Sequence, residues 1–208
     1  MVQGHGIPSE LVRDVRRVVE GYFSRSAEEK MLDCISPDNY TGYIPLGFFS
    51  PNTGGNTPDR YEGYKLHHET SLKQPIREQC DLYGPNKWPA EPEGMSEVIT
   101  KFWQACDVAG RHLLKLISQI MGVDKTAFLS FFDDPLTNMT LLHYPSQPAD
   151  RPKVGIHPHK DTDALTCAPS HVLASRYLGL DSWSFASAVS RKWSKMACRS
   201  SNRSSCRI

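Results

Sequence analysis

The sequence predicts an α+β fold in which helices come first and β-strands follow, or a β-barrel supported by helices. One observation is a run of helically spaced apolar residues over about 96–121. Another is the strict alternation of side-chain character from Asn138 to Tyr144, which is typical of a half-buried strand. Because the helical pattern precedes the alternating one, we expect a helical layer on which a later sheet rests.

The first third of the chain predicts two helices and little regular structure after them. Residues 3–8 form a Gly- and Pro-bounded loop in which we expect the His5 ring to bond nearby backbone rather than a metal. From Ser9 onward, apolar residues recur at helical spacing as far as Phe23. Ser26 and Glu29 form a capping-box pattern that predicts a second, short helix. Residues 34–95 are rich in Gly, Pro, Asn and Asp, and we expect one short strand there, within 39–47.

The long central helix is expected to be the spine of the fold. Ser96 is a candidate N-cap and Gly122 a candidate C′ residue. Asp124 is expected to cap a further short helix. The apolar stripe of the long central helix predicts burial of Ile99, Phe102, Trp103, Cys106, Leu113, Leu116, Ile117 and Ile120.

Composition excludes several classes of protein. The 208 residues suit one domain, and the net charge of +1 argues against a nucleic-acid or anionic-membrane partner. No apolar run reaches the roughly 18 residues of a membrane span, and the N-terminus lacks a secretion signal. The six cysteines form no CxxC pair, so we expect reduced thiols and a cytoplasmic protein.

The stretch 154–166 carries the chemistry. Residues 153–159 read as a strand, and alternation along it would place His157, His159 and Asp161 on one face. An imidazole and a carboxylate two residues apart, with a distant second His, make the facial triad of non-haem Fe(II) oxygenases. A pair made by His157 and His159 remains an alternative. By contrast, we expect His67-His68-Glu69 to be a solvated polar turn, because adjacent side chains point apart.

Five short motifs follow one another along the chain: Gly4-His5-Gly6-Ile7-Pro8, Ala27-Glu28-Glu29-Lys30, Asn86-Lys87-Trp88-Pro89, Leu142-His143-Tyr144-Pro145, and His159-Lys160-Asp161 continuing to Leu165-Thr166. Together they resemble the isopenicillin N synthase-like family of Fe(II)- and 2-oxoglutarate-dependent dioxygenases, in the style of fungal members that tailor secondary metabolites. The resemblance covers about residues 1–166.

The resemblance implies the site, the cofactors and the fold. His159 and Asp161 would be iron ligands, and Tyr144 would help to hold the 2-oxoglutarate carboxylate. Fe(II), 2-oxoglutarate and O₂ would then oxidise a small organic molecule on a monomeric enzyme. The fold would be N-terminal helices and a spine helix supporting an incomplete double-stranded β-helix, or jelly roll. We accordingly divide the chain into a helical region (1–137), the first strands of the β-helix core with the His-x-Asp motif (138–166), and a divergent tail (167–208).

The tail departs from the family pattern. The third iron ligand and a following Arg-x-Ser are not found: His171 lies too close to His159, and Arg203-Ser204-Ser205 has no His before it. We expect residues 167–208 to lack strands, to be disordered, and to come from a frameshift, an unspliced intron or a wrong gene model. Two other hypotheses stay open: an inactive truncated fragment or non-catalytic interaction protein, and a small metal-binding β-domain using His157, His159 and Asp161.

Overall fold

The structure, a computed structural model, describes residues 2–36, 39–49, 58–68, 85–133, 137–147, 155–157 and 164–167, and the backbone of 182–189. Helices dominate the first part of the chain and strands the last, as the sequence predicts. The elements are α1 (Ser9–Phe23), α2 (Ala27–Met31), β1 (Gly42–Ile44), β2 (Glu62–His67), α4 (Met95–Ile120), α5 (Lys125–Ser130), β3 (Asn138–Tyr144), β4 (Leu165–Cys167) and β5 (Ser182–Val189). No helix in these ranges is long and apolar enough to cross a membrane.

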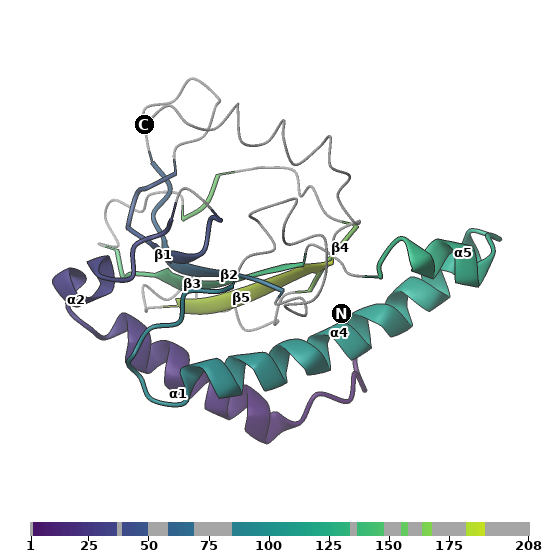
Figure 1. Cartoon of the computed structure of the whole chain (residues 1–208), viewed down its shortest axis with the longest axis horizontal. Coiled ribbons are helices and arrows are strands. Elements are labelled where there is room, and N and C mark those ends of the chain that lie inside the picture. Colours follow the sequence, from purple (N-terminus) through teal and green to yellow (C-terminus); the bar gives the residue numbers. More distant parts are fainter. Residues whose placement is uncertain are drawn as a thin grey trace.

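The strands form one antiparallel sheet in the order β1-β2-β3-β5-β4. Helices α1 and α4 lie side by side under one face of this sheet, while α2 flanks its β1 end (Figure 1). The α+β class and the antiparallel sheet are therefore confirmed. Closure into a double-stranded β-helix remains a prediction.

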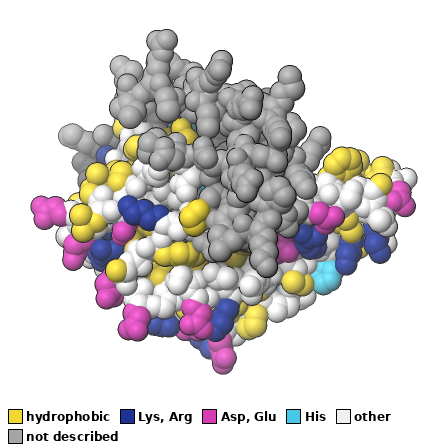
Figure 2. Space-filling view, in the orientation of Figure 1, with side chains coloured by type: hydrophobic (Ala, Val, Ile, Leu, Met, Phe, Trp, Pro, Cys, Tyr) yellow, Lys and Arg dark blue, Asp and Glu magenta, His cyan; other side chains and the backbone are white. Residues whose placement is uncertain are grey.

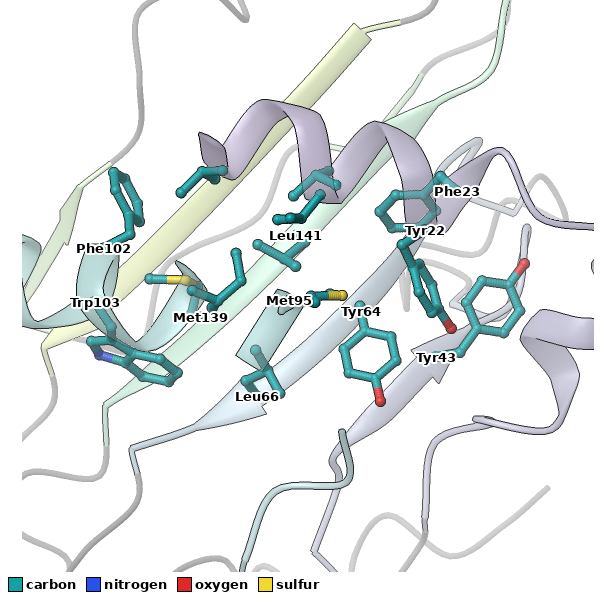
Figure 3. Packing of buried hydrophobic residues seen from close by; sticks show 14 of the residues in the cluster. Tyr22, Phe23, Tyr43, Tyr64, Leu66, Met95, Phe102, Trp103, Met139 and Leu141 are labelled. Atoms are coloured by element: carbon teal, nitrogen blue, oxygen red, sulfur yellow. The ribbon is translucent and has the colours of Figure 1, made fainter. Parts of the chain in front are cut away.

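The core lies between the sheet and the two long helices. Strand alternation sends Met139 and Leu141 of β3 toward the helices, and both side chains are fully buried. Tyr22 of α1 meets Tyr64 of β2 edge to face, with ring centroids 4.9 Å apart. Figure 3 shows these side chains together with Leu66, Met95 and Trp103, which come from β2 and α4. The helical stripes predicted for α1 and for the first half of α4 thus face the sheet.

The helix ends follow local chemistry. α1 has the predicted bounds, and the capping box is present: Ser26 N donates to Glu29 Oε2 at 2.9 Å and Glu29 N to Ser26 Oγ at 3.2 Å. α4 starts one residue before the prediction, because Gly94, at φ 77°, is its N-cap instead of Ser96. It ends at Ile120 with Met121 as its C-cap, and Gly122, at φ 65°, is the C′ residue as predicted.

The predicted stripe of α4 is wrong at two positions of its second half, although Ile117 is half-buried against Leu114 and Phe132. Leu116 and Ile120 are 54% and 85% exposed, whereas Leu114 is buried against Phe132. The reason is that α4 runs past the described strands, and among the described elements its last turns pack against α5 (Figure 1). Apolar side chains consequently remain at the surface around α5 (Figure 2).

Two expectations about strands are also wrong. β2 was not predicted, and it ends at His67, which is 5% exposed instead of lying in a solvated turn. The expectation that no strand follows Cys167 fails at β5, which pairs with both β3 and β4. The remaining tail, 168–181 and 190–208, lies outside the described residues, so the prediction of its disorder stays untested.

A buried ionic cluster links α2 to the end of α1 and to three strands. Lys30 Nζ donates to both carboxylate oxygens of Glu62, at 3.0 and 2.8 Å, and to the Phe23 carbonyl at 3.2 Å. Tyr43 O–H donates to the same carboxylate, and His143 Nδ1 lies 2.7 Å from it. Burial alone would raise the pKa of Glu62, but its bonds to His143, Lys30 and Tyr43 hold that pKa below the usual value. Glu62 is therefore a buried anion that ties α2, β1, β2 and β3 together.

Candidate functional site

Tyr144 lies at the end of β3, on the face of the sheet opposite the helical layer. Because successive strand residues point to opposite faces, the buried His143 beside it faces the core and Tyr144 faces away. The Tyr144 ring packs near the Tyr61 ring, with centroids 6.0 Å apart and planes tilted by 52°. Burial, with help from Asp59 and Tyr144, raises the pKa of Tyr61, so this second phenol is neutral at physiological pH.

The segment that leads into the His-x-Asp motif packs against Tyr144. Residues 155–157 form bends and not the predicted strand, because their polar groups bond outside any ladder. Arg60 N donates to the Gly155 carbonyl at 2.7 Å. A Cβ on Gly155 would lie 3.0 and 3.1 Å from Cδ1 and Cε1 of Tyr144, so a larger residue at this position would have to displace that ring by a few tenths of an ångström.

Asp59 holds the next residue of this segment. One carboxylate oxygen of Asp59, Oδ1, accepts from the His157 backbone N–H at 2.9 Å and lies 2.5 Å from His157 Nδ1. The two side chains are only 13% and 20% exposed. Asp59 N in turn donates to the Phe49 carbonyl at 3.0 Å. The chain before β2, the end of β3 and the segment 155–157 are thus one contiguous neighbourhood.

The two predicted metal ligands, His159 and Asp161, lie outside the described residues. Their role therefore stays a prediction that rests on their donor chemistry, one imidazole and one carboxylate, which suits Fe(II). Within the described part of the chain, no three His, Cys, Asp or Glu side chains gather closely enough to hold a metal ion. His5 behaves as expected: its Nδ1 accepts from Ile7 N at 3.1 Å, inside its own loop.

Sequence reasoning missed Asp59, Arg60 and Tyr61. Their signal was a polar and aromatic group immediately after Pro58, at the end of a Gly- and Pro-rich stretch. Such a group has no periodicity of its own, because its partners, Gly155, His157 and Tyr144, lie more than eighty positions further along the chain. Only the fold brings the two groups together.

Comparison with protein families and with other sequences gives consistent matches. Residues 1–91 match the family described as the N-terminal region of non-haem dioxygenases in morphine synthesis. The chain is 30% identical over 168 residues to the 2-oxoglutarate-dependent dioxygenase thnC of Trichoderma harzianum, covering 79% of this chain and 51% of that protein. It is 26% identical over 172 residues to the 2-oxoglutarate-Fe(II) type oxidoreductase hxnY of Emericella nidulans, covering 79% and 49%. The chain therefore spans about half the length of these relatives.

Solved structures share the fold. A 2OG-Fe(II) oxygenase family protein from Caulobacter crescentus superposes with a TM-score of 0.74 at 15% identity, covering 89% of this chain and 75% of that one. A Neurospora crassa protein crystallised with alpha-KG and thymine gives a TM-score of 0.71 at 18% identity, covering 90% and 74%. At such low identities the likeness concerns the fold alone.

Proposed function

The chain belongs to the family of 2-oxoglutarate- and Fe(II)-dependent non-haem dioxygenases, and we propose that it functions as an oxygenase of a small organic molecule, with Fe(II), 2-oxoglutarate and O₂ as its reactants. The observation that carries this proposal is the placement of Tyr144. Its side chain lies at the end of β3, off the core, against the segment 155–157 that leads directly into His159-Lys160-Asp161. A strand end beside a fixed segment is a rigid place for a binding site.

Each residue has a defined part in this proposal. His159 and Asp161 hold the iron, and the Tyr144 hydroxyl donates to a carboxylate oxygen of 2-oxoglutarate. Bound iron supplies the O₂ chemistry, which protein side chains alone do not perform. Tyr61, a neutral phenol, places an aromatic surface beside the Tyr144 ring.

The substrate class follows from the kinds of relatives. The fungal proteins thnC and hxnY carry names that state 2-oxoglutarate dependence, and a fungal structural neighbour was crystallised with thymine, a small molecule. These support a small organic substrate, and we place the reaction in secondary-metabolite biosynthesis in the cytoplasm, performed by a monomer.

An anaerobic titration tests the proposal. Adding Fe(II) and 2-oxoglutarate to the 208-residue chain should produce a visible metal-to-cosubstrate charge-transfer band. His159→Ala and Asp161→Ala should abolish the band. Tyr144→Phe should keep iron uptake and lower the affinity for 2-oxoglutarate by about tenfold, because it removes one charge-assisted hydrogen bond. Metal binding that does not change when 2-oxoglutarate is added would favour a simple metal-binding domain. No uptake at all would favour a non-catalytic role.

A further inference from the structure

We propose that Asp59 is a positioning residue for the iron motif, acting through His157. This inference rests on the proposed function and adds a residue that neither the His-x-Asp pattern nor Tyr144 implies. Asp59 lies three residues before β2 begins, and His157 lies two residues before the expected ligand His159. The Asp59 carboxylate thus binds His157, the residue that comes shortly before the expected metal ligands.

The contact fixes both the backbone and the ring of His157. Asp59 Oδ1 accepts from the His157 amide at 2.9 Å and lies 2.5 Å from the ring nitrogen Nδ1. A carboxylate can only accept, so the hydrogen of the ring contact is on Nδ1. Because Asp59 is only 13% exposed at its side chain, water competes weakly for these bonds. One anion therefore sets the position of the chain and the rotation of the imidazole at once.

Two further contacts keep Asp59 and this segment in register. Arg60 N, the next residue's amide, donates to the Gly155 carbonyl at 2.7 Å, two residues before His157. Gly155 itself rests on the Tyr144 ring at the end of β3. The segment 155–157 is thus tied at both ends, to the chain before β2 and to the residue proposed to bind 2-oxoglutarate.

Chain geometry carries this constraint to the ligands. His159 follows His157 by only two residues, at most about 7 Å of extended chain, so a displacement of His157 would be passed on to the expected ligand. Metal affinity is sensitive to such displacement, since loss of groups that orient ligands commonly costs about 10–100-fold in binding. The simpler alternative is that Asp59 stabilises the fold without affecting the site, and the two differ in what they do to metal binding.

The experiment compares Asp59→Ala with a matched control, Asp33→Ala. Asp33 also has a side chain that is 13% exposed, and it also pairs with one basic side chain, Arg25, at 3.0 Å, but it lies between α2 and β1, away from this neighbourhood. Thermal midpoints and the anaerobic Fe(II)/2-oxoglutarate charge-transfer titration are measured for both variants. We expect both midpoints to fall, but only Asp59→Ala to weaken Fe(II) binding, by about 10–100-fold.

Two graded variants sharpen the result. Asp59→Asn keeps an oxygen that accepts from His157 and should recover part of the affinity. His157→Ala keeps the amide contact but loses the ring contact, so its loss should be smaller than that of Asp59→Ala. Equal Fe(II) affinity in the wild type and Asp59→Ala, with a lowered midpoint, would overturn the proposal.

Hydrogen exchange separates this proposal from the proposed function. If the wild-type chain takes up no Fe(II), the function fails, but the contact is still measurable without metal. The His157 amide should then be protected in the wild type and in Asp33→Ala, and should exchange at least about tenfold faster in Asp59→Ala. A His157 amide that exchanges freely in the wild type would show that Asp59 does not hold this segment.

Discussion

Replacing Lys30 by Met removes one charge from the buried cluster while keeping most of the side-chain volume. In the wild type the Lys30 and Glu62 side chains are 8% and 7% exposed, so neither ion is screened by water. The substitution leaves the Glu62 carboxylate with Tyr43 and His143 as partners. It also deprives the Phe23 carbonyl of a donor at 3.2 Å.

The expected loss is large because the remaining anion stays buried. Breaking a buried ion pair by removing one partner typically costs about 3–5 kcal/mol. The two donors that remain on Glu62 place Lys30→Met at the lower end, about 3 kcal/mol. In a chain of this size each kcal/mol lowers the thermal midpoint by about 2–4 °C, so the midpoint should fall by about 6–12 °C.

Thermal unfolding followed by circular dichroism, at pH 7 and low salt, measures this fall. The matched control is Lys101→Met, which breaks an exposed pair with Glu97 on α4 whose side chains are 61% and 69% exposed. That control should leave the midpoint unchanged, because water and salt screen exposed charges. A Lys30→Met midpoint within about 2 °C of the wild type would refute the reasoning, since it would mean that Glu62 does not need its cation.

Three further changes test other parts of the structure. Burial lowers the pKa of His67 from 6.5 to about 4. Between pH 6.5 and 4 the unfolded chain therefore binds a proton at His67 that the folded chain does not bind. The free energy of unfolding should fall by about 3 kcal/mol over this range because of His67. In urea titrations, His67→Leu should lack this part of the pH dependence. Gly42→Ala should cost at least about 2 kcal/mol, because φ is 120° and the new Cβ would lie 2.6 Å from a backbone oxygen, whereas Gly4→Ala, with open space around it, should cost less in the same thermal assay. Gly155→Ala should displace the Tyr144 ring by a few tenths of an ångström. We expect this variant to bind 2-oxoglutarate more weakly in the anaerobic titration, while its thermal midpoint changes little.

The sequence predicts those parts of the fold that local rules decide. The bounds of α1, the capping box at Ser26 and the left-handed stop at Gly122 each depend on residues within one or two helical turns. The alternation that predicts β3 is similarly local, and in the structure its buried residues are Met139, Leu141 and His143. Tyr144 could be assigned to the non-core face for the same reason.

Features that depend on distant partners were not predictable in this way. β2 carries Glu62, Lys65 and His67, polar residues that hide a strand unless the burial of Glu62 beside Lys30, 32 positions away, is known. Residues 155–157 have the composition of a strand, yet their carbonyl and amide groups bond to Arg60 and Asp59 instead of to a neighbouring strand. β5 alternates Ser with Trp183 and Phe185, a signal that the Ser- and Arg-rich sequence around it obscures.

The ionic cluster and the candidate site depend on the same strand register. Glu62 and His143 are direct partners across β2 and β3, and their side chains also bond to each other on the core side. Sliding β3 by one residue would turn His143 away from Glu62 and bring Tyr144 into the core. Such a slip would leave the buried Glu62 carboxylate without its partner His143. The cluster therefore favours the register in which Tyr144 faces Tyr61 and Gly155. The charges inside the core, together with buried Met139 and Leu141, therefore favour the register in which Tyr144 lies on the opposite face of the sheet.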